Sequence, residues 1–179
     1  ALHNGIIENY QELKNKLLRK GYTFYSETDT EVAVKLIDYY YKKYEGTPVD
    51  AINHSLVRIR GSYALAVMFK DYPEEIYVAR KDSPMILGVA DGESYVASDV
   101  PAILKYTRNV YYIGNLEMAR VRKGEITFYN LEGEEIQKDF NETYPDVEIL
   151  YNADSSGTLL TQIEEGYAVS YTHLTLPTI

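Results

Sequence analysis

The hydrophobic periodicity of this 179-residue chain changes near Gly61, and that change limits the folds open to it. Before Gly61, apolar residues recur at the three- and four-residue spacing of amphipathic helices. After it, short runs rich in β-branched and aromatic residues are separated by Asp, Gly and Pro turn signals. Helices followed by mostly antiparallel strands predict an α+β domain whose helices cover its sheets.

The expected elements follow from these patterns. Helices are predicted over 8–20, 26–46 and 47–60, with Pro48 at a tolerated first helical position and Gly21 and Gly46 as stop signals. A short strand is predicted at 22–26, and one or two helical turns at 100–106. The remaining strands are expected at 62–69, 75–80, 85–90, 94–98, 109–113, 117–122 and 125–130.

Domain organisation follows from where the periodicity stops. At 45% hydrophobic residues, the chain is long enough to bury the core of one domain. Beyond about residue 140 no period is sustained. We therefore assign 1–140 to the domain and expect 141–179 to be a linker or a non-native tail.

Composition excludes several classes of function. Eighteen Lys and Arg against 27 Asp and Glu give a net charge of −9, which repels nucleic acid and anionic membranes. The chain has no Cys, and His3, His54 and His173 lack metal-ligand spacing, so we expect neither a metal nor a cofactor. No apolar run approaches the roughly 18 residues of a membrane span. We expect a cytoplasmic protein.

Four stretches in order resemble one family. They are HNGIIENYQELKNKLLRKGYTFYSETDTEV, RGSYALAVMF, ARKDSPMILGV and YVASDVPAIL. The first resembles the glutaminase domain of class II glutamine amidotransferases. The others resemble its isomerising glutamine–fructose-6-phosphate aminotransferase (glucosamine-6-phosphate synthase) branch, and the resemblance runs from residue 2 to residue 138. It implies an N-terminal-nucleophile hydrolase fold, an αββα sandwich.

The resemblance also implies a reaction and its partners. In that family an N-terminal Cys attacks the side-chain amide of glutamine, and its own α-amino group serves as the base. The ammonia passes to a downstream domain that acts on fructose 6-phosphate, in an enzyme expected to be a homo-oligomer. Because this chain has no Cys, we expect a domain truncated at both ends, incomplete at its N-terminus, that does not hydrolyse glutamine by itself.

Three site residues are carried over by the resemblance. Asn4 and Gly5 are implied to form the oxyanion hole, where a side-chain amide and a backbone N–H stabilise the charge on the attacked carbonyl. Asp29 is implied to bind the α-ammonium of glutamine. Taken alone, Asn4–Gly5 is typical of a hairpin turn and Asp29 of a helix N-terminus. His3 is expected to have a structural role at the corner between strand and helix.

Other interpretations remain open at this stage. The chain could be the glutaminase domain of a different class II amidotransferase, or a non-catalytic domain of the same fold that binds an amino acid or a partner chain. Two further features have structural readings. Ser98–Asp99 are expected to cap a short helix, and Arg80 and Lys81 to be solvated loop charges.

Overall fold

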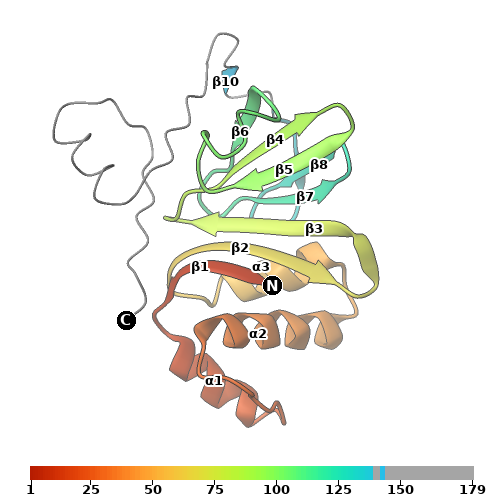
Figure 1. Cartoon of the computed structure of the whole chain (residues 1–179). Helices are drawn as coiled ribbons and strands as arrows, with labels where there is room; N and C mark the ends of the chain where they lie inside the picture. Colours follow the sequence, from red (N-terminus) through yellow and green to blue (C-terminus); the bar gives the residue numbers. More distant parts are fainter. Residues whose placement is uncertain (139–141, 144–179) are drawn as a thin grey trace, which may run out of the picture.

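The chain folds as two antiparallel β-sheets with three helices against the outer face of one of them (Figure 1), as described by a computed structural model for residues 1–138 and 142–143. Helices α1 (Tyr10–Leu18), α2 (Asp29–Tyr44) and α3 (Pro48–Leu56) form the outer layer. The predicted α+β class and the order of helices before most of the strands are confirmed.

The larger sheet has six strands in the order β1-β2-β3-β7-β8-β9, all neighbours antiparallel. Strand β1 lies at one edge and pairs with β2 alone among the described strands. The bounds are β1 (Leu2–Ile7), β2 (Gly61–Phe69), β3 (Tyr72–Lys81), β7 (Met118–Arg122), β8 (Glu125–Tyr129) and β9 (Glu135–Ile136).

Within the described residues, the smaller sheet has four strands in the order β10-β6-β4-β5. Its hairpin of β4 and β5 turns through Asp91–Gly92, as the sequence predicted. The bounds are β4 (Ile86–Ala90), β5 (Glu93–Ala97), β6 (Asn109–Tyr112) and β10 (Glu142–Thr143). The segment assigned to a linker or tail otherwise lies outside the described residues, so that assignment stays a prediction.

Side chains alternate between the two faces of each strand, so the larger sheet contributes to a hydrophobic core on each face. Between the helices and the larger sheet, Leu36 and Ile52 pack on Leu65. Between the two sheets, Val78 packs with Leu87. The outer face of the smaller sheet is covered by the turn segment at 101–106, whose Ile103 packs on Ile86 and Val110.

The prediction of a strand at 22–26 is wrong. Among these residues the backbone N–H groups of Tyr25 and Ser26 donate to the carboxylate of Glu31, at 2.7–3.1 Å, and not to a neighbouring strand. The hydroxyl of Ser26 donates to the same carboxylate at 2.7 Å. The local pattern resembled a strand, but these side-chain contacts shape the segment as the entry to α2.

The helix termini follow capping rules. Thr47 and Asp50 form a capping box at α3 with Pro48 directly after the cap, and Thr28 caps α2 by accepting from the N–H of Glu31 at 3.3 Å. The third helix ends at Leu56, earlier than predicted. Within the described part of the chain, no helix is long and apolar enough to cross a membrane.

The contacts of Glu31 lead to a prediction about acid stability. The hydrogen bond from Ser26 and the backbone N–H of Tyr25 lower the pKa of Glu31. A lowered folded-state pKa means that its contribution is complete above the unfolded value of about 4.3 and is lost as pH falls through the lower folded value. Glu31→Gln should therefore reduce Tm at neutral pH, with the difference from the unsubstituted chain shrinking on acidification.

This prediction is checked by thermal unfolding monitored by circular dichroism between about pH 7 and about pH 3. Glu132→Gln, at an exposed turn residue, is the matched control and should leave Tm nearly unchanged. A Tm difference for Glu31→Gln that stays constant over this range would contradict the assignment.

Candidate active site

Strand β1 presents one edge of its backbone to β2, and no strand of the described residues pairs with the other edge, which we call the free edge. The N–H of Glu8, directly after the strand, donates to the carbonyl of Arg60 at 3.0 Å, on the β2 side. The N–H of Ile7 instead donates to the carboxylate of Asp29 at 2.9 Å. Since backbone groups alternate along a strand, the N–H of Gly5 belongs to the same free edge as that of Ile7.

The backbone conformation of Gly5 would direct a Cβ atom at the backbone of β2. Its φ is +130°, which a residue with a side chain rarely adopts. A Cβ at this position would lie 2.3 Å from the carbonyl oxygen of Ser62. Only glycine fits both constraints, so the residue type is required by the pairing of β1 with β2. The alternative reading of Asn4–Gly5 as a hairpin turn is wrong, because both residues lie inside β1.

Asn4 lies next to Gly5 with its side chain on the opposite face of the sheet from Ile7. In the β1–β2 register Asn4 faces Ala64, a residue of the core between the sheets, whereas Ile7 belongs to the core beneath the helices. Directly paired residues share a face. Asn4 is exposed, and its amide is therefore accessible beside the free edge of β1.

Asp29 is the first residue of α2, and the cap itself is Thr28. Its carboxylate reaches β1, where one oxygen accepts from the N–H of Ile7 and the other lies 3.5 Å from Nδ1 of His3. The side chain remains 25% exposed, which leaves room for a ligand to approach. The helix-terminus reading and the reading as a presented carboxylate are both compatible with this placement.

His3 connects the start of β1 to the start of α2. Its side chain is only 2% exposed, and Nδ1 lies 3.2 Å from the hydroxyl of Thr30. This placement fits the structural role expected for His3. Asn9 supports the same corner, because its side-chain amide donates to the carbonyl of Arg58 and accepts from the N–H of Arg60, both at 2.9 Å.

The three residues singled out in the sequence therefore lie along one short stretch of the free edge of β1. Asn4 and Gly5 are in the strand, and Asp29 joins it at Ile7, about 10 Å from Asn4 along the strand. The Ile7 N–H contact had no sequence signal, since it is a backbone group. Thr30 was missed as well, because a Thr in a first helical turn usually has only local partners.

The prediction that Arg80 is a solvated loop charge is wrong. Arg80 lies in β3 and donates to the carbonyl of Ile113 at 2.8 Å. The expected cap at Asp99 is present, since its carboxylate accepts from the N–H of Ala102 at 3.1 Å, although a turn and not a helix follows.

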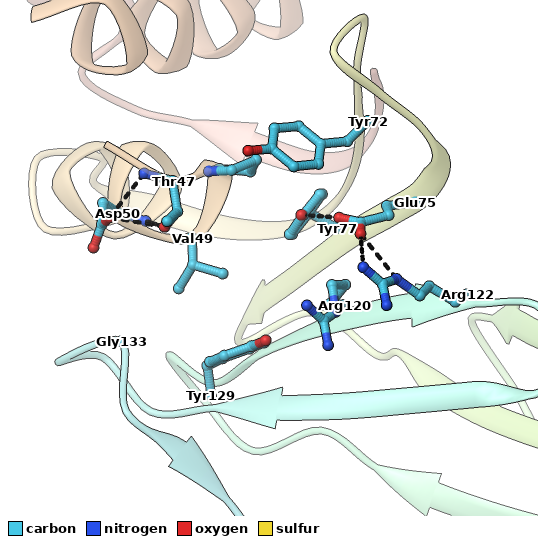
Figure 2. A pocket seen from close by; sticks show the side chains of 11 residues that line it. Thr47, Val49, Asp50, Tyr72, Glu75, Tyr77, Arg120, Arg122, Tyr129 and Gly133 are labelled. Carbon is cyan, nitrogen blue, oxygen red and sulfur yellow. Dashed lines mark hydrogen bonds and ion pairs between the residues drawn. The ribbon is translucent and has the colours of Figure 1, made fainter. Parts of the chain in front are cut away.

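Among the described residues, no group of three or more His, Asp and Glu side chains could hold a metal ion. A cavity of about 370 Å³ opens elsewhere, between the start of α3 and strands β3, β7 and β8 (Figure 2), and is not lined by Asn4, Gly5 or Asp29.

Comparison with known proteins gives this geometry a context. Residues 1–105 match the glutamine amidotransferase domain family, which is more than half of the chain. The chain belongs to that family. It is 46% identical over 165 residues to glutamine–fructose-6-phosphate aminotransferase (isomerizing) of Caldanaerobacter subterraneus, and 49% identical over 131 residues to the protein of that name from Pyrococcus horikoshii.

These matches cover 92% and 73% of this chain but only 27% and 22% of the relatives, so the chain spans about a quarter of their length. Among solved structures, glutamine phosphoribosylpyrophosphate amidotransferase from B. subtilis aligns with a TM-score of 0.60 and 27% identity, over 73% of this chain and 28% of that one. The predicted family and its class II, N-terminal-nucleophile hydrolase fold are confirmed.

The close approach at Gly5 gives a stability prediction. Gly5→Ala should reduce the free energy of unfolding by about 2 kcal/mol or more, because the Cβ meets backbone that cannot move aside and φ is unfavourable. Gly21→Ala is the control, since Gly21 also has a positive φ, +87°, but no atom within 4 Å of a Cβ. It should cost only about 1 kcal/mol.

Urea unfolding of the two variants measures this difference. Equal losses of stability would mean that the approach of β1 to β2 at Gly5 is looser than described.

Proposed function

We propose that this chain is the glutamine-hydrolysing, ammonia-supplying domain of an enzyme that makes glucosamine 6-phosphate from fructose 6-phosphate and glutamine. The support is twofold. The relatives that are 46% and 49% identical to it over the aligned residues are named for that aminotransferase. The observation that carries the mechanism is that Asn4 and Gly5 lie in β1 and that Asp29 is hydrogen-bonded to the same strand at Ile7.

Asn4 and Gly5 take the role of oxyanion hole. Attack on the side-chain amide of glutamine moves negative charge onto the carbonyl oxygen, and donors fixed in advance lower that barrier. The exposed amide of Asn4 and the N–H of Gly5 belong to consecutive residues of a strand paired along its length with β2. The pairing of β1 with β2 positions the backbone N–H of Gly5 before the substrate arrives.

Asp29 binds the α-ammonium group of glutamine. A carboxylate in this role makes a charge-assisted hydrogen bond and discriminates against amides that lack the amino group. The N–H of Ile7 fixes one oxygen of Asp29, while the partial exposure of the side chain lets an ammonium approach. The orientation of the carboxylate is thus set before the substrate arrives.

The nucleophile is a thiol from outside these 179 residues, because the chain contains no Cys. The chain alone therefore does not hydrolyse glutamine and binds it weakly. Ammonia released in the complete enzyme passes to the part that handles fructose 6-phosphate. We place this enzyme in the cytoplasm as a homo-oligomer.

A second candidate is the glutaminase domain of another class II amidotransferase. The fold shared with the B. subtilis phosphoribosylpyrophosphate amidotransferase favours it, since the same domain there belongs to a protein with a different name and acceptor. A non-catalytic domain that binds an amino acid or a partner is the third candidate.

A hybrid enzyme distinguishes the three candidates. In it, the matching segment of the C. subterraneus relative is replaced by residues 1–138 of this chain.

The first candidate requires this hybrid to form glucosamine 6-phosphate from fructose 6-phosphate and glutamine. Ammonia release without amino-sugar formation would favour the second candidate. A folded hybrid that binds glutamine but releases no ammonia would favour the third.

Asn4→Ala in the hybrid should lower kcat for glutamine hydrolysis by roughly 10²-fold or more with little change in KM, as expected for the loss of one oxyanion donor. Asn15→Ala, which removes an exposed amide from α1, is the control and should leave both constants unchanged. An unchanged kcat for Asn4→Ala would remove the oxyanion assignment.

Asp29→Asn in the hybrid should raise KM for glutamine by roughly tenfold or more while changing kcat less, because it removes the charge that pairs with the α-ammonium. It should also reduce the preference for glutamine over glutaramate, the analogue without an α-amino group, as competing ligands. Asp91→Asn, at an exposed turn residue, makes the same charge change as a control. Undiminished discrimination in Asp29→Asn would place ammonium recognition elsewhere.

A further inference from the structure

The helix-facing side of the larger sheet carries a polar stretch where β7 and β8 lie beyond the helices. In β7, Ala119 and Val121 face the core between the sheets, whereas Met118 belongs to the core under the helices. Alternation therefore places Arg120 and Arg122 on the helix-facing side as well. These two positions carry arginine where the middle of the sheet carries apolar side chains.

A cavity of about 370 Å³ opens over this polar stretch, with Arg120 and Arg122 on its floor and the start of α3 along one side (Figure 2). Pro48 and Val49 line it from α3, and Tyr72 from the start of β3. Its walls thus combine apolar surface with a few polar groups, a combination that small-molecule sites share.

One of the two arginines is already neutralised. Glu75 is 5% exposed, and its carboxylate accepts from the hydroxyl of Tyr77, from Nε of Arg122 at 2.8 Å and from a second Arg122 nitrogen. Burial acts to raise the pKa of Glu75, but the hydrogen bonds from Tyr77 and Arg122 outweigh it and the pKa is lowered. Glu75 is therefore ionised, and the charge of Arg122 balances it.

The other arginine, Arg120, has N–H groups without a partner among the described residues. Arg120 donates from one terminal nitrogen to the hydroxyl of Thr127 at 3.1 Å, and it lies 3.6 Å from Glu125, a carboxylate 55% exposed and so screened by water. Its Nε is buried and has no partner among the described residues. Figure 2 shows the hydroxyl of Tyr129 turned toward the same guanidinium.

We propose that this cavity binds a small organic anion, with a carboxylate or phosphate group on Arg120 and Tyr129 and an apolar part against Pro48, Val49 and Tyr72. The side chain of Arg120 is 24% exposed, and only one of its terminal nitrogens donates to a described side chain, so N–H groups remain for a ligand. An oxyanion supplies the acceptors and the opposite charge together. This site is separate from Asn4, Gly5 and Asp29 and does not rest on the proposed function.

The test is the titration of the whole chain with benzoate and with phenyl phosphate, followed by calorimetry and by backbone amide shifts in NMR spectra. Saturable binding of either probe, with shifts concentrated in β7, β8 and the start of α3, is expected, and the tighter probe identifies the preferred group. No binding of either up to about 10 mM, or shifts confined to other regions, would overturn the proposal.

Substitutions connect the binding to the named side chains. Arg120→Gln should weaken the tighter probe by about tenfold or more, and Tyr129→Phe by about threefold or more. Arg19→Gln, an exposed arginine at the end of α1, removes the same charge and should leave the affinity unchanged. If Arg120→Gln does not fold, Tyr129→Phe decides alone, because it removes only a hydroxyl. Unchanged affinity in every folded variant of Arg120 and Tyr129 would overturn the proposal.

Discussion

The central strands of the larger sheet are buried on both faces, and this double burial determines where polar chemistry can lie. In β2, Tyr63 and Leu65 pack under the helices while Ala64 packs against the smaller sheet. A polar side chain placed there would lose water from either side and would need a partner in the core. Polar groups able to meet a ligand are therefore expected at the margins, where one of the covering layers ends.

Both candidate sites occupy such margins. At the free edge of β1 the sheet has no further described strand, and the N–H of Ile7 is satisfied by Asp29 from the neighbouring helix. That hydrogen bond occupies part of the open edge and at the same time presents a carboxylate on the strand that carries Asn4 and Gly5. At β7 the covering helix layer ends over the face of the sheet. There Arg120 and Arg122, beside the start of α3, take the place of apolar side chains.

Much of the fold was accessible from the sequence because periodicity reports which face of an element is buried. The three helices and the main strand runs appeared in the predicted order. The errors came where distant side chains replaced regular backbone pairing. At Tyr25 and Ser26 the carboxylate of Glu31 takes the N–H groups that a strand would offer a neighbour, and Arg80 is bound to a carbonyl more than thirty residues away.

Local pattern and motif order were enough to predict the α+β class, the family resemblance and Asn4, Gly5 and Asp29 as candidate site residues. Tertiary structure alone decided that Gly5 is needed for contact with Ser62, and that Asp29 meets the backbone of Ile7. It also decided which of two similar arginines keeps unpaired donors. The physical reason is that such contacts join residues far apart in the chain, and their partners are fixed only when sheet register and helix packing bring them together.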